Sequence, residues 1–192
     1  AAASEVDSRL FEEMIENQDK IESKVGTEAM REKIIFCANN TLDQSIEFDS
    51  ENLYDEAIKA VKPLGRSERK TFEAEAEMKV AYAKKDSESY LKASKDYLKY
   101  QQSIEAKMEW SKESLSKFPK DEEVQLYVLE TMEDDMKKSV DVKDIKWLCS
   151  LMFQLNQKDK AIEYAKNRTP AIDDPKDKKQ LQNLIKYMEK QS

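Results

Sequence analysis

The stretch from Lys70 to Tyr100 constrains the fold most, because its apolar residues recur at the spacing of amphipathic helices. A polar break at Lys84-Lys85-Asp86 divides it, and Ser87 or Ser89 is the expected N-cap of the second helix. Neither helix can bury its apolar stripe alone, so the sequence predicts an antiparallel helical hairpin. The residues expected to face inward are Phe72, Ala76, Met78, Ala81, Tyr82, Tyr90, Leu91, Ser94, Tyr97 and Leu98.

Turn-forming residues are scarce in the whole chain, which has two Gly and four Pro among 192 residues. Apolar residues make up 39% and charged residues 38%, a composition typical of a mostly helical protein with a charged surface. So high a charge would also suit a disordered chain. The two Trp, eight Tyr and six Phe residues at helical spacing argue against disorder, because they can form a core.

The net charge of −7 comes from acidic and basic residues that alternate along the chain. A nucleic-acid-binding surface needs a basic stripe, and the sequence contains only short Lys pairs, so we expect no nucleic-acid partner. No apolar run approaches the length of about 20 residues that crosses a membrane, so we expect no membrane span. We also find no signal peptide in the sequence.

The rest of the chain reads as further helices, so the expected fold class is all-α. We expect a single domain over residues 1–192, built as a stack of antiparallel helical hairpins in a superhelix like that of tetratricopeptide repeats. Expected N-caps include Ser103, Asp49 or Ser50, and Asp174 followed by Pro175. The expected hairpins and the capping helix at the C-terminus span residues 4–42, 49–100, 103–138, 141–168 and 174–190.

A repeat is suggested by three pairs of residues that begin at Ala57, Tyr90 and Ala161. Each pair lies early in the expected second helix of a hairpin. Their spacings of 33 and 71 residues are close to one and two periods of the tetratricopeptide repeat, about 34 residues. The Gly of the usual turn and the Trp-Leu-Gly-Tyr signature of the first helix are absent, so the repeats are degenerate.

Four short segments form a further pattern, which consists of Glu28-Ala29-Met30, Ala38-Asn39-Asn40, Ala81-Tyr82-Ala83-Lys84-Lys85-Asp86 and Asp159-Lys160-Ala161-Ile162. In these segments the chain resembles the helical C-terminal region of some secreted bacterial thioredoxin-fold proteins. The resemblance implies a noncatalytic protein-interaction region attached to a thioredoxin domain, in a periplasmic or other extracytoplasmic location. It does not carry over redox activity, because the chain has no Cys-x-x-Cys pair.

The chain has no histidine, which removes the commonest general base and most zinc sites. Cys37 and Cys149 fall on apolar helix faces, where we expect small core residues. Neither a calcium loop nor a phosphate-binding glycine loop is present, so we expect no cofactor and no metal. A thiol-active fragment that uses Cys37 or Cys149 is the enzymatic alternative.

The first helices of stacked hairpins would line a groove, and lysines beside aromatic residues there could hold a peptide. The sequence therefore predicts a noncatalytic scaffold that binds a protein or peptide, with no enzyme activity of its own. A free-standing cytoplasmic adaptor is a further alternative. The candidate groove residues are Phe72, Lys79, Tyr82, Lys143, Lys146 and Phe153.

Overall fold

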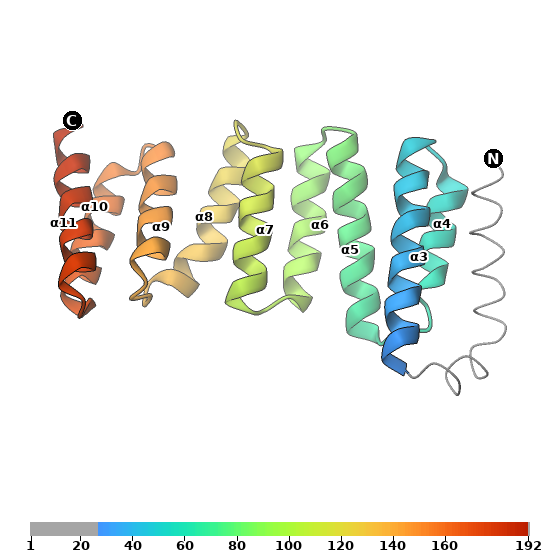
Figure 1. The fold of residues 1–192 in the computed structure, drawn as a ribbon. Helices are drawn as coiled ribbons and strands as arrows, with labels where there is room; N and C mark the ends of the chain where they lie inside the picture. Colours follow the sequence, from blue (N-terminus) through green and yellow to red (C-terminus); the bar gives the residue numbers. More distant parts are fainter. Residues whose placement is uncertain (1–26, 192) are drawn as a thin grey trace. The chain divides into compact units, whose positions relative to one another are not determined.

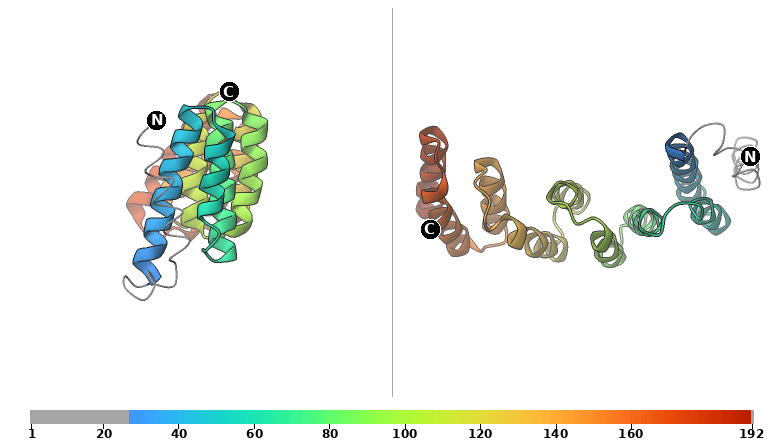
Figure 2. Two further views of the ribbon diagram at one scale, coloured as in Figure 1. Left: turned by 90° about the vertical axis from the view of Figure 1, so that its right-hand side faces the viewer. Right: turned by 90° about the horizontal axis from the view of Figure 1, so that it is seen from below.

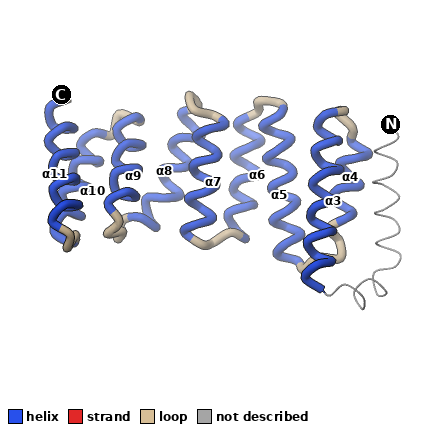
Figure 3. The backbone as a smooth tube through the Cα atoms, viewed as in Figure 1, coloured by secondary structure: helices blue, strands red, loops and turns tan. Residues whose placement is uncertain are grey.

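The computed structural model describes residues 27–191, and every regular element in that range is a helix (Figure 1, Figure 3). The described residues include no strand, which agrees with the predicted all-α class. The helix predicted near residues 4–25 lies outside the described range. Contacts divide the chain into two compact units, with the boundary between Gln101 and Gln102, whereas the sequence analysis treated it as one domain.

Unit 1 contains two helical pairs, α3 with α4 and α5 with α6, and the members of each pair run antiparallel (Figure 1). This pairing differs from the expected hairpins, because α3 packs against the helix that follows it and residues 49–100 belong to two pairs. The first half of the expected hairpin 4–42 is not described. The bounds are α3 Thr27–Glu47, α4 Glu51–Ala60, α5 Arg66–Ala83 and α6 Ser87–Tyr100.

The core of the first pair rests on a stripe of α3 residues spaced four apart, which places them on one helix face. Alanines on α4 let its backbone approach that stripe closely, and α5 covers the same cluster from one side. The cluster consists of Met30, Ile34, Ala38, Leu42, Ala57, Ala60, Val61, Phe72 and Ala76.

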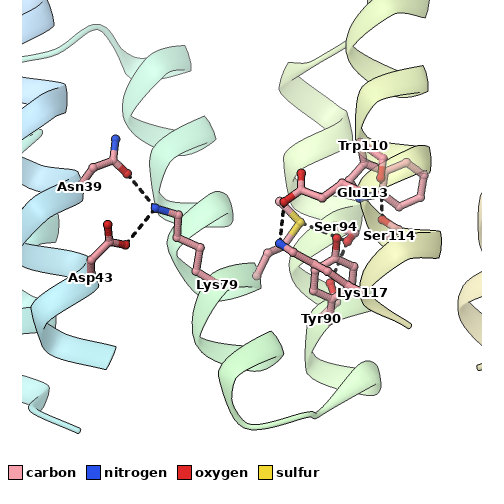
Figure 4. Close-up of polar contacts among 10 residues, drawn as sticks. Asn39, Asp43, Lys79, Tyr90, Ser94, Trp110, Glu113, Ser114 and Lys117 are labelled. Carbon is pink, nitrogen blue, oxygen red and sulfur yellow. Dashed lines mark hydrogen bonds and ion pairs between the residues drawn. The ribbon is translucent and has the colours of Figure 1, made fainter. Parts of the chain in front are cut away.

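The pair α5 and α6 confirms the hairpin predicted between Lys70 and Tyr100. Tyr90 is almost fully buried on α6, and the buried Ser94 hydroxyl lies 2.8 Å from the Tyr90 carbonyl and 3.2 Å from the Met78 sulfur (Figure 4). These contacts satisfy the polar group that the hairpin buries.

Three of the helical pairs turn through the same backbone motif. One residue adopts a left-handed conformation after the first helix, with φ of 48° at Asp49, 55° at Lys85 and 57° at Asn156. The next residue then donates its N–H to a carbonyl five residues back, as in the Schellman motif. The donor–acceptor pairs are Ser50 to Ser45 at 2.9 Å, Asp86 to Ala81 at 2.9 Å and Gln157 to Met152 at 2.8 Å.

The residue that follows the left-handed position is also the N-cap of the next helix. Ser50 accepts a hydrogen bond from the Leu53 N–H, which settles the expected choice between Asp49 and Ser50. The predicted N-cap of α6 was wrong, because Asp86 rather than Ser87 or Ser89 occupies it.

Unit 2 contains the pairs α7 with α8 and α9 with α10, followed by α11. Figure 2 shows α9, α10 and α11 side by side. Ser103 caps α7 and Asp174 caps α11, as predicted. The bounds are α7 Ile104–Lys117, α8 Glu122–Met136, α9 Val142–Gln154, α10 Lys158–Arg168, the 3-10 turn η1 Thr169–Ala171 and α11 Pro175–Lys190.

An edge-to-face aromatic pair joins α7 to α8, with the Trp110 and Tyr127 rings 5.7 Å apart at 82°. The end of α8 is held by α10. Tyr164 donates to the Met136 carbonyl at 2.8 Å, and Arg168 donates to the Ser139 carbonyl at 2.9 Å. Met136 is the last residue of α8 and Ser139 lies in the turn after it, so neither carbonyl has a partner within α8.

Candidate functional site

The predicted groove residues of unit 1 have different surroundings in the structure. Lys79 on α5 donates to the Asn39 amide oxygen and pairs with Asp43, both at 3.2 Å, so it bridges α5 to α3 (Figure 4). Phe72 is only 4% exposed and belongs to the core, although it borders a small cleft. Tyr82 was expected to face inward and is 44% exposed. Because Lys79 pairs with Asp43 and bonds to Asn39, it connects α5 to α3 within unit 1.

The other predicted groove residues lie in unit 2 and are described within it. Lys143 is exposed on α9, and Phe153 is half-buried. Lys146 donates to the Gln180 side chain at 3.2 Å, which links α9 to α11. In each unit, one of the predicted groove lysines therefore connects two helices: Lys79 connects α5 to α3, and Lys146 connects α9 to α11.

Neither Cys37 nor Cys149 forms a disulfide within the part of the chain that the structure describes. Cys149 is fully buried, and its Sγ lies 3.6 Å from the Ala161 carbonyl oxygen. Burial raises the pKa of the Cys149 thiol to about 12, so the reactive thiolate is scarce at neutral pH. Cys37 is half-buried and packs against the core of unit 1. These surroundings suit packing better than thiol chemistry.

A cleft within unit 1 has a volume of about 580 Å³, within the range of small-ligand sites. We call it the α4 cleft, because the turn before α4 and the first turns of α4 form much of its wall. The ends of α3 and α5 complete it. Its ten lining residues are Ser45, Ile46, Asp49, Ser50, Glu51, Tyr54, Asp55, Val80, Ala83 and Lys84.

The α4 cleft is acidic. Asp49, Glu51 and Asp55 contribute three carboxylates, and Lys84 contributes the one basic group of its lining. Tyr54 is half-buried there, and its pKa is raised to about 12 by burial and by the nearby charges of Glu77, Glu73 and Asp55. Burial alone would raise the pKa of a phenol, and the three carboxylates raise the Tyr54 pKa further because they disfavour a second negative charge beside them.

Sequence reasoning missed the α4 cleft because it searched the faces of the first helices. The sequence feature that could have indicated the cleft is the acidic stretch from Asp49 to Asp55, in which Tyr54 directly precedes Asp55. Runs of acidic residues are common in this chain, which has 40 Asp and Glu residues, so the turn did not stand out. Only the packing of α5 against it makes a hollow.

Within residues 27–191, no group of three or more His, Cys, Asp or Glu residues has the arrangement of a metal site. The described helices include none with both the length and the apolar character that a bilayer crossing demands. In comparisons with known proteins, the chain matches no family model, no curated protein and no solved structure.

Proposed function

We propose that the chain is a noncatalytic helical scaffold that binds a protein or peptide partner. We also propose that it is the helical region of a thioredoxin-like protein in an extracytoplasmic compartment. The degenerate tetratricopeptide-like repeat and the resemblance of the sequence to such regions support both statements. The scaffold acts through shape and charge complementarity rather than through bond chemistry.

The observation that carries the proposal is the regular recurrence of the hairpin turn. The second helices of the four pairs have N-caps at positions 50, 86, 121 and 157, which are 36, 35 and 36 residues apart. A period near 34 residues is that of tetratricopeptide repeats, whose stacked hairpins present surfaces to peptides. Helical arrays of this kind are binding modules far more often than they carry catalytic groups.

The chemistry of the described residues also favours binding. The chain lacks histidine, and its fully buried Cys149 has a pKa of about 12. The surface offers exposed aromatic residues, including Phe36 and Phe48, beside a high density of charge. Aromatic and charged groups together are typical of protein interfaces.

A peptide array tests the proposal directly. The purified chain, labelled and applied at 1–100 μM as an assay range on the order of weak peptide affinities, should bind a subset of immobilised 12-residue peptides in a saturable way. Insulin reduction with dithiothreitol should be no faster with the chain than without it. The proposal would be overturned if no peptide on the array bound in a saturable way. It would also be overturned if the chain accelerated insulin reduction and Cys37→Ser abolished that acceleration.

The sequence encoded upstream of Ala1 tests the thioredoxin link separately. A Cys-x-x-Cys domain there supports the proposed attachment. A start codon immediately before Ala1 contradicts it and supports the free-standing adaptor instead.

A further inference from the structure

The α4 cleft is built where two helices end. α3 ends at Glu47 and α5 ends at Ala83, and residues of both final turns line the cleft. The carbonyl end of a helix carries a partial negative charge, which favours a cation. The amino end of α4 also lies here, but its Leu53 N–H is already bonded to the Ser50 hydroxyl at 3.4 Å. Two carbonyl ends and one amino end meet at the cleft, so the helix ends together contribute a net negative potential.

The polar groups of the cleft are mostly acceptors. Ser45 is only 5% exposed, and its hydroxyl donates to the Leu42 carbonyl at 2.7 Å, which leaves the oxygen free to accept. No ion pair within residues 27–191 joins Asp49, Glu51 or Asp55 to a basic side chain. A ligand that donates several hydrogen bonds from a positive group matches these acceptors.

Apolar surface accompanies the acidic groups. Ile46, Val80 and Ala83 line the α4 cleft, and Phe48, which precedes Asp49 in the turn, is 61% exposed. Arginine and lysine have apolar stems and charged ends, so they can cover such surface while the charge meets a carboxylate.

From this combination we propose that the α4 cleft binds a basic side chain, an arginine or a lysine, from an extended peptide segment of the partner. The inference rests on the proposed scaffold function and names the site and the chemistry of its ligand. The carboxylates of the α4 turn receive the cation, and the apolar wall from α3 and α5 receives its stem. Lys84, at the C-cap of α5, also lines the cleft, and its positive charge repels the cation.

The test uses three blocked, fluorescent hexapeptides that differ only at one central residue between leucines. That residue is arginine, its neutral isostere citrulline, or glutamate. Fluorescence anisotropy with the full chain should give a dissociation constant about tenfold lower for the arginine peptide than for the citrulline peptide. The glutamate peptide should bind most weakly. Raising the salt concentration should reduce the differences in dissociation constant among the three peptides.

Variants of the cleft should change the arginine affinity in opposite directions. Asp55→Asn should weaken arginine binding about fivefold, whereas Lys84→Gln should strengthen it by a similar factor. Glu32→Gln is the matched control, because it removes the same charge from an exposed position on α3 thirteen residues before Ser45, roughly 20 Å along the helix. Its affinity should equal that of the unchanged chain.

The outcomes separate this inference from the scaffold function. Equal affinity for the arginine and citrulline peptides, or equal weakening by Asp55→Asn and Glu32→Gln, refutes the cationic site. The scaffold function survives that result if the array still shows saturable binding to other peptides. The two cleft substitutions and the Glu32→Gln control are at exposed positions, and unchanged thermal melts will show that any loss of binding is not a loss of folding.

Discussion

Replacing Ala161 by aspartate probes how closely α10 packs on α9. Ala161 is fully buried, and its carbonyl accepts the Cys149 thiol at 3.6 Å. Ala161 and Ala165 are the two buried residues of α10, so the helix is held by small side chains that permit close approach. A longer, charged side chain at Ala161 has neither the room nor a solvent path.

Two costs add in this variant. Forcing extra atoms into a packed interface costs about 1–3 kcal/mol. Burying a neutral polar group without a hydrogen-bond partner costs about 1–3 kcal/mol by the measure of protein mutants, and burying a charged one costs more. The free energy of unfolding of unit 2 should therefore fall by about 3 kcal/mol, near the upper range of single substitutions. For a unit of this size, that lowers the melting temperature by roughly 12–24 °C.

Thermal and urea unfolding followed by circular dichroism will measure the loss. Glu163→Asp is the matched control, because it places the same side chain on the exposed face of the same helix and should be nearly neutral. Ala161→Leu isolates the packing cost and should lose less stability than Ala161→Asp. If the Ala161→Asp and Glu163→Asp melts shift alike, the packing of α10 described above is wrong.

Three further changes test other parts of the structure. Native Cys149 should react with iodoacetamide at pH 8 about a thousandfold more slowly than an unfolded thiol, and Cys149→Ser should leave the faster labelling of Cys37 unchanged. Tyr164→Phe removes the hydrogen bond to the end of α8 and should lower the free energy of unfolding, measured in urea, by about 1 kcal/mol. An unchanged free energy of unfolding would contradict that hydrogen bond. Hydrogen bonds from Ser89 lower the pKa of Asp86, so its stabilising effect should be present at neutral pH and lost as pH falls through the lowered pKa. Asp86→Asn should flatten that part of the pH–stability curve.

The helices were predictable because their signals are local. The four-residue spacing of apolar positions on α3 and the cap at Ser103 are properties of short stretches of sequence. The pairing of the helices was harder, because α3 has apolar residues that could have faced a helix on either side. The N-cap at Asp86 was missed since the preceding left-handed residue is Lys85 rather than glycine. A lysine at that position gives no sequence sign of the turn.

The candidate site was less predictable than the fold. Lysines such as Lys79 and Lys146 were expected in a groove, but each has a polar partner on a helix distant in the sequence. Those partners, Asn39 and Gln180, are 40 and 34 residues away, so no local pattern reveals them. The α4 cleft depends in the same way on α5, which brings Val80 to the acidic turn.

The shared turn motif bears on how the chain tolerates changes in length. In three pairs, only three residues separate one helix from the next, the last two being a left-handed residue and an N-cap, and their N–H groups are already bonded. One residue inserted there would rotate the following helix by roughly 100° and carry its buried face toward solvent. The links at residues 61–65 and 137–141 join one pair to the next. In these two links the N-cap residue does not also close a left-handed turn. Insertions and deletions acquired during evolution should therefore collect between the pairs, and whole pairs should be gained or lost as single units.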